Sequence, residues 1–223
     1  MCGRYTLFTD FDSLIERFDI ESSIEENQFI PSYNIAPSQH VVSIIYDGTK
    51  NRLGKLRWGF IPRWAKDEKI SYKMINARSE TVDQKPSYRN AFFKRRCLIP
   101  MDSFYEWKKH DSGKIPMRIK MKSDEVFAVA GLWESWDAPD GKTIHSCTIL
   151  TTEANSLVSD IHDRMPVILR PEDVKVWLNP ELQEIETLKK LLVPYDASFM
   201  EAYAVSSDVN SPKNNHKGLL NSL

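Results

Sequence analysis

The feature that most limits what this chain can fold into is a long series of strand-like segments through its middle. These segments are rich in β-branched and aromatic residues, with turn signals at Ser112-Gly113 and Pro139-Asp140-Gly141. Because the strands are grouped rather than alternated with helices, the pattern favours an antiparallel sheet or barrel over a parallel βαβ fold. The predicted strands are Cys97–Ile99, Ser103–Lys108, Pro116–Lys120, Val126–Trp133 and Ile144–Thr151.

Helical patterns lie mainly outside this series. Before it, apolar residues recur at i, i+3, i+4 and i+7 from Phe11, with Thr9 and Asp12 as the predicted capping pair. After it, Thr152 is predicted to cap a short helix. The predicted helices are Thr9–Asp19, Pro86–Arg96, Glu153–Val158, Pro171–Leu178 and Glu181–Leu192. Further strands are expected at Val41–Tyr46, Leu53–Phe60 and Ala202–Val205.

The chain of 223 residues has no internal repeat, low-complexity block or linker, so we predict one domain over residues 1–223. Residues 21–28 are polar and predict a loop, and the two prolines of 31–37 predict an extended, irregular segment. From about residue 208 the chain is a polar tail. The predicted fold class is α+β, a single compact domain with an antiparallel β-barrel-like core and peripheral helices.

Charge and cysteine usage restrict the partners and the compartment. The formal net charge is -1, so any contact with nucleic acid must come from a local basic patch. Three cysteines without a C-x-x-C pair argue against a disulfide scaffold and for a reducing compartment. The sequence has no apolar run of about 18 residues and no signal-peptide pattern, so we expect a cytoplasmic protein that does not associate with membranes.

Cys2 is the most unusual residue because of its position. Removal of Met1, which is common when the second residue is small, would leave Cys2 as an N-terminal 1,2-aminothiol. The α-amine, with a pKa of roughly 7.7–8, can form an imine with an aldehyde, and the thiol can then close a five-membered thiazolidine. The amine can also act as the base for its own thiol, as in N-terminal nucleophile hydrolases. The plain alternative is a chance cysteine at a frayed terminus.

Other polar residues each have a chemical and a structural interpretation. Asn76 with Arg78 offers an amide donor and a phosphate-binding guanidinium, or else a loop with a capping asparagine. Strand alternation places Glu106 on the face of Phe104, where desolvation would raise its pKa; alternatively, it faces water from an edge strand. His162 lies between acidic and arginine neighbours, which suits proton transfer or a position at a helix C-terminus.

Aromatic and basic residues interleave over 57–73, as in proteins that stack single-stranded bases beside a cationic groove. Trp58 is expected in the core and Trp64 at the surface. The alternative is a core strand followed by a solvated loop.

Metal and nucleotide motifs do not occur in the sequence. It has no H-x-x-H or HExxH spacing, no Walker A loop and no G-x-G-x-x-G, so we expect no metal and no cofactor. Cys97 and Cys147 lie in apolar strands and are interpreted as core thiols.

Taken together and in order, seven segments resemble the SRAP family, the SOS response-associated peptidases or abasic-site processing proteins. They span essentially the whole chain and are specific jointly rather than singly: MCGRY, PSYNIAPS, RWGFIPRWA, INARSET, RCLIPMDSFYEWKK, IHDRMPVIL and VSSDVNSPKNN. The resemblance implies a compact domain with a barrel-like core and a positively charged groove for single-stranded DNA.

The resemblance also implies a chemistry and a set of residues. Mature Cys2 would crosslink to an abasic site through a Schiff base that closes to a thiazolidine, assisted by Asn76, Glu106 and His162. Phosphates would be contacted by Arg4, Arg78 and Arg164, and a junction between single and double strand would be wedged by Pro37 and Trp64. The family often has a second tryptophan after the first, where this chain has Ala65.

The expected activity is therefore that of an abasic-site sensor in single-stranded DNA, including single-strand/duplex junctions. It would protect the lesion during the DNA damage response and associate with the nucleoid when on DNA. Nothing in the sequence indicates an obligate interface, so we expect a monomer. Two alternatives stay open: a cysteine peptidase that removes its own Met1, and a non-catalytic module that binds single-stranded DNA.

Overall fold

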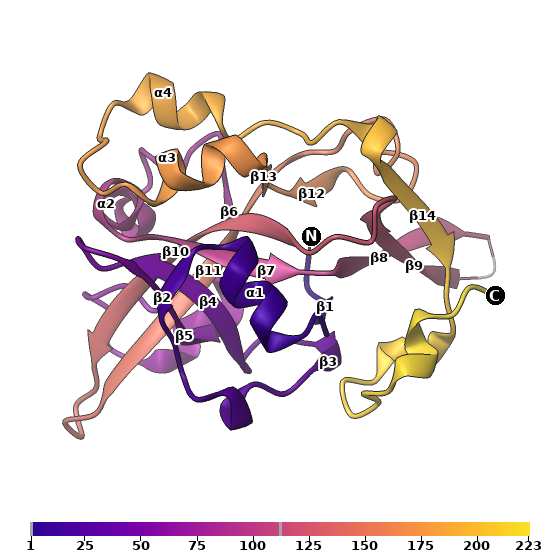
Figure 1. Ribbon diagram of the computed structural model, residues 1–223, viewed down its shortest axis with the longest axis horizontal. Helices are drawn as coiled ribbons and strands as arrows, with labels where there is room; N and C mark the ends of the chain where they lie inside the picture. The colour runs from indigo at the N-terminus through magenta and orange to yellow at the C-terminus, as the bar shows by residue number, and fades with distance from the viewer. Residues whose placement is uncertain (1, 112) are drawn as a thin grey trace.

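The core is a barrel of five strands, and the computed structural model describes residues 2–111 and 113–223. The strands are β4 (His40–Tyr46), β5 (Asn51–Trp58), β7 (Arg96–Met101), β10 (Phe127–Asp137) and β11 (Thr143–Glu153). They pair antiparallel in the order β11-β10-β7-β4-β5, and a parallel pairing of β5 with β11 closes the ring (Figure 1). The predicted barrel-like core is confirmed.

A second sheet continues from the barrel and includes the start of the chain. Its order is β14-β9-β8-β1-β3, for β1 (Tyr5–Leu7), β3 (Ser32–Ile35), β8 (Ser103–His110), β9 (Gly113–Met121) and β14 (Met200–Ala204). Strand β8 therefore lies inside this sheet, between β9 and β1. Short strands add to the barrel: β2 (Ile20–Ser22), β6 (Asn76–Arg78), β12 (Arg164–Pro166) and β13 (Ile168–Leu169). The predicted Ser112-Gly113 turn includes a residue outside the described ranges.

The helices are short and peripheral. Helices α2, α3 and α4 gather at one end of the molecule, away from the C-terminus (Figure 1). The helices are α1 (Phe11–Arg17), α2 (Pro86–Lys94), α3 (Val174–Leu178) and α4 (Ile185–Lys190). The 3-10 turns are η1 (Glu26–Gln28), η2 (Glu68–Lys73), η3 (Pro171–Asp173), η4 (Ala197–Phe199), η5 (Ser207–Asn210) and η6 (Lys217–Leu220). In the described part of the chain, no helix has the length and apolar character needed to span a membrane.

Two local predictions are wrong for identifiable reasons. Helix α1 is capped by Asp10, whose carboxylate accepts the backbone N–H of Ser13 at 2.9 Å, because the Thr9 hydroxyl instead donates to Asp102. The helix predicted at Glu153–Val158 is absent from the described structure. Strand β11 continues through Glu153 in register with β12, and the chain then makes a turn rather than a helix.

The polar C-terminal segment packs onto the second sheet. Val209 and Leu219 are fully buried within it, next to Tyr105. The side chain of Asn34 on β3 also donates hydrogen bonds to three carbonyls of this segment, those of Val209, Ser211 and Asn214. The C-terminal segment therefore packs beside β3 and β8, close to the beginning of the chain.

A buried arginine joins the helical end to the barrel. Arg96 on β7 is 4% exposed, and burial lowers its pKa to about 10, so it stays charged at neutral pH. Its guanidinium donates to backbone carbonyls at the ends of α2 and α3 and before α4, those of Phe92, Phe93, Trp177, Asn179 and Leu182. One side chain thus satisfies carbonyls that the helix ends leave without partners.

Arg96→Lys is expected to lower the free energy of unfolding by about 2–4 kcal/mol, because a single ammonium cannot reach all of these carbonyls. Urea denaturation followed by circular dichroism measures the change. The control is Arg17→Lys, at a half-exposed ion pair with Glu125, which should change the free energy by less than about 0.5 kcal/mol. Equal midpoints for the two variants would contradict the assigned role of Arg96.

Candidate active site

Cys2 lies at the buried start of the second sheet. Tyr5 on β1 pairs with Phe104 on β8, and the carbonyl of Arg4 accepts the N–H of Tyr105 at 2.9 Å. This antiparallel pairing leads back along β1 toward Cys2, which is completely buried. A frayed terminus at Cys2 is therefore ruled out. Its thiol is held in the interior, and Met1 lies outside the described residues.

Asn76 reaches Cys2 from the barrel. Strand β6 runs parallel to β11, with Asn76 opposite Ile149, and this pairing directs the amide toward the beginning of the chain. The Asn76 Nδ2 group donates to the Cys2 carbonyl at 2.9 Å. Its Oδ1 atom is buried and has no hydrogen-bond partner within residues 2–111 and 113–223. Asn76 therefore fixes the Cys2 backbone and keeps an acceptor available for an amine or a hydroxyl.

Glu106 is the buried carboxyl of the site. It lies on the inner strand β8 and is only 3% exposed, so the interpretation of a glutamate facing water from an edge strand is wrong. Burial raises the pKa of Glu106, and interaction with His162 partly opposes that rise. Burial also raises the pKa of the Cys2 thiol, and the Glu106 carboxylate raises it further. Cys2, Glu106 and His162 are thus close enough to interact electrostatically.

His162 lies in the turn that precedes β12 and is partly exposed. Its Nδ1 atom accepts the backbone N–H of Arg164 at 3.0 Å, which leaves Nε2 as the protonated nitrogen of the neutral ring. Nδ1 also lies 2.9 Å from Asp163 Oδ1, a contact that becomes a hydrogen bond only when the ring is protonated. His162 thus has a backbone N–H and a carboxylate within hydrogen-bonding distance of the same ring nitrogen.

Two of the three predicted phosphate-binding arginines are held by protein groups. Arg164 makes a bidentate ion pair with Glu80, at 2.6 and 2.9 Å, and donates to the Thr151 carbonyl at 2.7 Å. Arg78 is exposed and lies opposite Thr151 in the β6–β11 pairing, so it shares this side of the barrel with Arg164.

Arg4 is also held in place by protein groups. Its Nη1 atom donates to Asn34 Oδ1 at 2.9 Å and to the Val209 carbonyl at 2.6 Å, and its guanidinium lies over the Trp107 ring. Sequence reasoning missed the supporting roles of Asn34 and Glu80. Neither lies near its arginine in the chain, and no local sequence pattern indicates either contact.

The predicted stacking residue is at the surface, and its neighbour is not. Trp64 is 60% exposed, whereas Trp58 is 1% exposed and belongs to the core as predicted. Ala65 is buried against Trp136, whose indole N–H donates to the Ala65 carbonyl at 2.8 Å. The chain thus presents a single indole at this point. Pro37 is half-buried just before Ser38, whose N–H donates to the carbonyl that ends β5.

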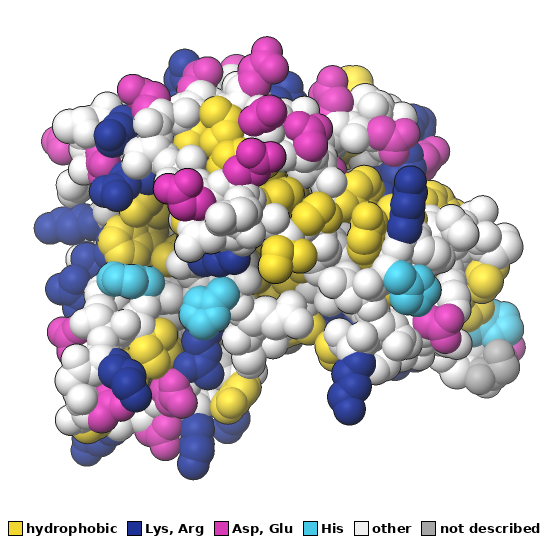
Figure 2. Space-filling model, turned by 60° about the horizontal axis from the view of Figure 1, so that its bottom comes forward, with side chains coloured by type: hydrophobic (Ala, Val, Ile, Leu, Met, Phe, Trp, Pro, Cys, Tyr) yellow, Lys and Arg dark blue, Asp and Glu magenta, His cyan; other side chains and the backbone are white. Residues whose placement is uncertain are grey.

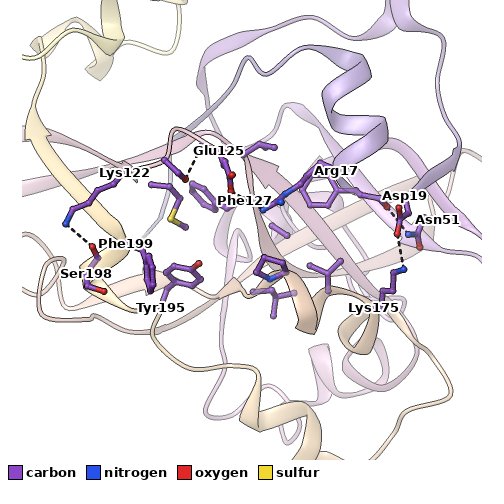
Figure 3. Close-up of a pocket in the computed structure, with 18 residues that line it drawn as sticks. Arg17, Asp19, Asn51, Lys122, Glu125, Phe127, Lys175, Tyr195, Ser198 and Phe199 are labelled. Carbon is purple, nitrogen blue, oxygen red and sulfur yellow. Dashed lines mark hydrogen bonds and ion pairs between the residues drawn. The ribbon is translucent and has the colours of Figure 1, made fainter.

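A hollow between two lobes marks one side of the molecule, and lysine and arginine side chains lie on both sides of it (Figure 2). A separate cavity of about 550 Å³ lies between α1, α3 and the segment 121–128 (Figure 3). None of the predicted site residues lines that cavity. In the described part of the chain, no cluster of three or more His, Cys, Asp or Glu side chains is arranged to hold a metal ion.

Glu106→Gln is expected to stabilise the fold at neutral pH. Because burial raises the pKa of Glu106 above its ordinary 4.5, the folded state binds this proton more tightly than the unfolded state. The native protein therefore loses stability as pH rises from 4.5 through the raised pKa. Glutamine removes this loss, so the gain in melting temperature should be larger at pH 7 than at pH 4, where both states hold the proton.

The size of that gain is read from melting curves, where about 1 kcal/mol corresponds to about 2–4 °C in a chain of this length. Glu125→Gln, at a carboxylate that is 64% exposed, is the control and should show no such gain. A Glu106→Gln variant that is less stable than the parent at pH 7 would refute the cost assigned to the buried charge.

A family model and the curated relatives both assign this chain to one protein family. The model of the family described as SOS response associated peptidase (SRAP) matches residues 1–212. The chain is 60% identical, over 223 residues and 100% of both proteins, to the abasic site processing protein YoqW of Bacillus subtilis (strain 168). It is 30% identical over 222 residues to the abasic site processing protein HMCES of Xenopus tropicalis, covering 86% of this chain and 66% of that protein.

The fold is also found among solved structures. A protein from Bacteroides thetaiotaomicron matches with a TM-score of 0.90 and 28% sequence identity, and 100% of each chain is covered. A protein from Bordetella bronchiseptica matches with a TM-score of 0.79 and 29% identity, covering 92% of this chain and 100% of that one.

Proposed function

The chain belongs to the SRAP family, and from that premise we propose that it processes abasic sites in single-stranded DNA by capturing them covalently on Cys2. Relatives named abasic site processing proteins support the class of lesion. One observation supports covalent capture most directly. The Asn76 amide donates a hydrogen bond to the backbone of the buried Cys2, and the Glu106 carboxylate interacts electrostatically with the Cys2 thiol. Imine and thiazolidine formation need a terminal amine with an adjacent thiol, and the neighbouring carboxyl and amide can transfer protons and position the amine.

The proposed reaction begins with removal of Met1, which frees the α-amine of Cys2. The amine attacks C1′ of the ring-opened sugar aldehyde and forms an N–C1′ bond in a carbinolamine. Loss of one water gives the imine. The Cys2 sulfur then adds to C1′, and its proton passes to the former imine nitrogen, which closes the thiazolidine. Atoms and charge balance without an oxidant, a metal or a cofactor.

Each neighbouring group has a role in proton transfer or positioning. Glu106, with its raised pKa, accepts and returns protons while carbinolamine becomes imine and while the thiol adds. Asn76 holds the Cys2 backbone and offers its Oδ1 atom to the amine or to a sugar hydroxyl. His162 moves a proton at the sugar oxygens during ring opening. Closure of the thiazolidine removes the aldehyde and so protects the strand from β-elimination.

The DNA-binding residues are proposed to act through phosphates and stacking. Arg4, Arg78 and Arg164 would contact the backbone, and the hydrogen bonds that already hold Arg4 and Arg164 would fix their guanidinium planes in advance. Pro37 and Trp64 would lie at a single-strand/duplex junction. None of these contacts reads a base edge, so binding follows the lesion rather than the sequence. We propose that a cytoplasmic monomer acts in this way and joins the nucleoid when bound.

The direct test uses purified protein, single-stranded DNA with one abasic site, and a denaturing gel. A heat-stable adduct on the abasic strand, absent on the intact strand, is expected. Salt-labile binding with no adduct would refute covalent capture in favour of a binding module. Turnover of peptides without an adduct would refute it in favour of a peptidase.

A further inference from the structure

We propose that Arg63 contacts a backbone phosphate of the bound single strand beside Trp64, and that the buried carboxylate of Glu134 holds Arg63 in position to do so. This inference rests on the proposed function, because it concerns the strand that flanks the captured lesion. It adds a phosphate-binding residue and a positioning residue to the predicted set.

The backbone on either side of Arg63 is fixed to the barrel. The N–H of Ile61 donates to the Ser146 hydroxyl on β11 at 2.9 Å, and the Trp136 indole donates to the Ala65 carbonyl at 2.8 Å. Ile61, Ala65 and Trp136 also pack together as a small apolar cluster. The segment that carries Arg63 and Trp64 is therefore held at both ends rather than free to move as a loop.

Glu134 binds two arginines with one carboxylate. It lies on β10 and is 4% exposed; its Oε1 atom accepts from Arg63 Nε at 2.9 Å and its Oε2 atom from Arg95 Nη2 at 2.8 Å. The Arg95 side chain is 13% exposed and by itself neutralises the buried carboxylate. Arg63 is thus a second cation on a single anion, and the group of three carries a net positive charge.

That surplus charge lies at the surface. The Arg63 side chain is 61% exposed although its Nε is bound, and its Nη1 and Nη2 atoms make no hydrogen bond to any described residue. The adjacent Trp64 ring is 60% exposed. A guanidinium edge and an indole face on neighbouring residues match the phosphate and the base of one nucleotide, the pairing that single-strand binding uses.

The test measures binding of an intact oligonucleotide without an abasic site, by fluorescence polarisation over a range of salt concentrations. Arg63→Ala is expected to weaken binding about tenfold at low salt, through the loss of one charge-assisted hydrogen-bonded contact. The slope of log K against log salt should become shallower by about 0.7, the value for one phosphate on a single strand. Arg17→Ala on α1 removes another glutamate-paired arginine and should leave the slope unchanged.

The role of Glu134 is tested in a double-mutant cycle. Glu134→Gln should weaken binding when Arg63 is present and have no effect in the Arg63→Ala background, because Glu134 acts through Arg63. A Glu134→Gln effect of equal size in both backgrounds would overturn the positioning role and indicate a general structural one. If circular dichroism shows that Glu134→Gln unfolds, the Arg63→Ala slope decides alone.

An unchanged affinity and slope for Arg63→Ala would overturn the proposed phosphate contact. Because the probe has no aldehyde, this outcome is independent of covalent capture. Failure of the proposed function is seen instead as a missing adduct between the parent protein and the abasic strand.

Discussion

Cys2→Ala is expected to abolish the heat-stable adduct with abasic single-stranded DNA. The alanine variant keeps an N-terminal amine once Met1 is removed, so it can still form the imine, but it has no sulfur to close the ring. An imine hydrolyses on denaturation, whereas a thiazolidine persists. Borohydride should therefore trap an adduct with Cys2→Ala, and without borohydride the gel should show free DNA only.

The same variant separates chemistry from folding. Cys2 is fully buried but small, so its replacement by alanine removes one sulfur atom from the interior and no hydrogen-bonded charge. Affinity for intact single-stranded DNA should be retained, because the proposed phosphate contacts come from other residues. Loss of DNA binding together with the adduct would mean that Cys2 supports the structure rather than the reaction.

A terminal block provides the matched control. One lysine inserted between Met1 and Cys2 keeps the thiol in the chain but leaves it without an adjacent free amine. Intact mass should show the retained terminus, and the gel should show no heat-stable adduct. An adduct formed by this blocked protein would contradict the role of Cys2 as an aminothiol.

The sequence was most informative where local pattern decides structure. Alternation along 103–108 was enough to place Glu106 on the face of Phe104, and grouping of the strands was enough to predict the barrel. Whether β8 is an edge strand depends on β1, which pairs with the first residues of β8 in the same sheet and spans only Tyr5–Leu7. Three residues carry too little periodicity to be recognised as a strand. The sequence alone could therefore not decide between a buried Glu106 with a raised pKa and a glutamate that faces water from an edge strand.

The sequence also did not show which residues far apart in the chain pair or bond with one another. The barrel closes through a parallel pairing of β5 with β11, and no local pattern specifies that pairing. The same holds for the bidentate contact of Arg164 with Glu80 and for the hydrogen bond of Arg4 to Asn34. Residues of the right type could be named from motifs, but the groups that hold them could be found only in three dimensions.

Glu106→Gln is expected to slow adduct formation by about 10²–10⁴-fold at neutral pH, the usual contribution of a positioned proton-transfer group. The pH dependence gives a sharper test. Loss of the free amine below its pKa of roughly 7.7–8 lowers the rate of both proteins, tenfold per pH unit. In the parent protein the rate falls further at the pH where Glu106 becomes protonated. Because burial raises the pKa of Glu106, that pH lies above the ordinary 4.5.

Below that point log rate should fall with a slope of two for the parent and of one for Glu106→Gln. Single-turnover time courses from pH 4 to 9 measure both slopes, with Glu125→Gln as a control that should follow the parent. Parallel profiles for parent and Glu106→Gln would refute proton transfer by Glu106. A damaged fold cannot mimic the expected result, because the substitution that slows capture should also raise the melting temperature at pH 7. A slower reaction in a more stable protein identifies a buried carboxyl that is retained for its chemistry despite its cost to the fold.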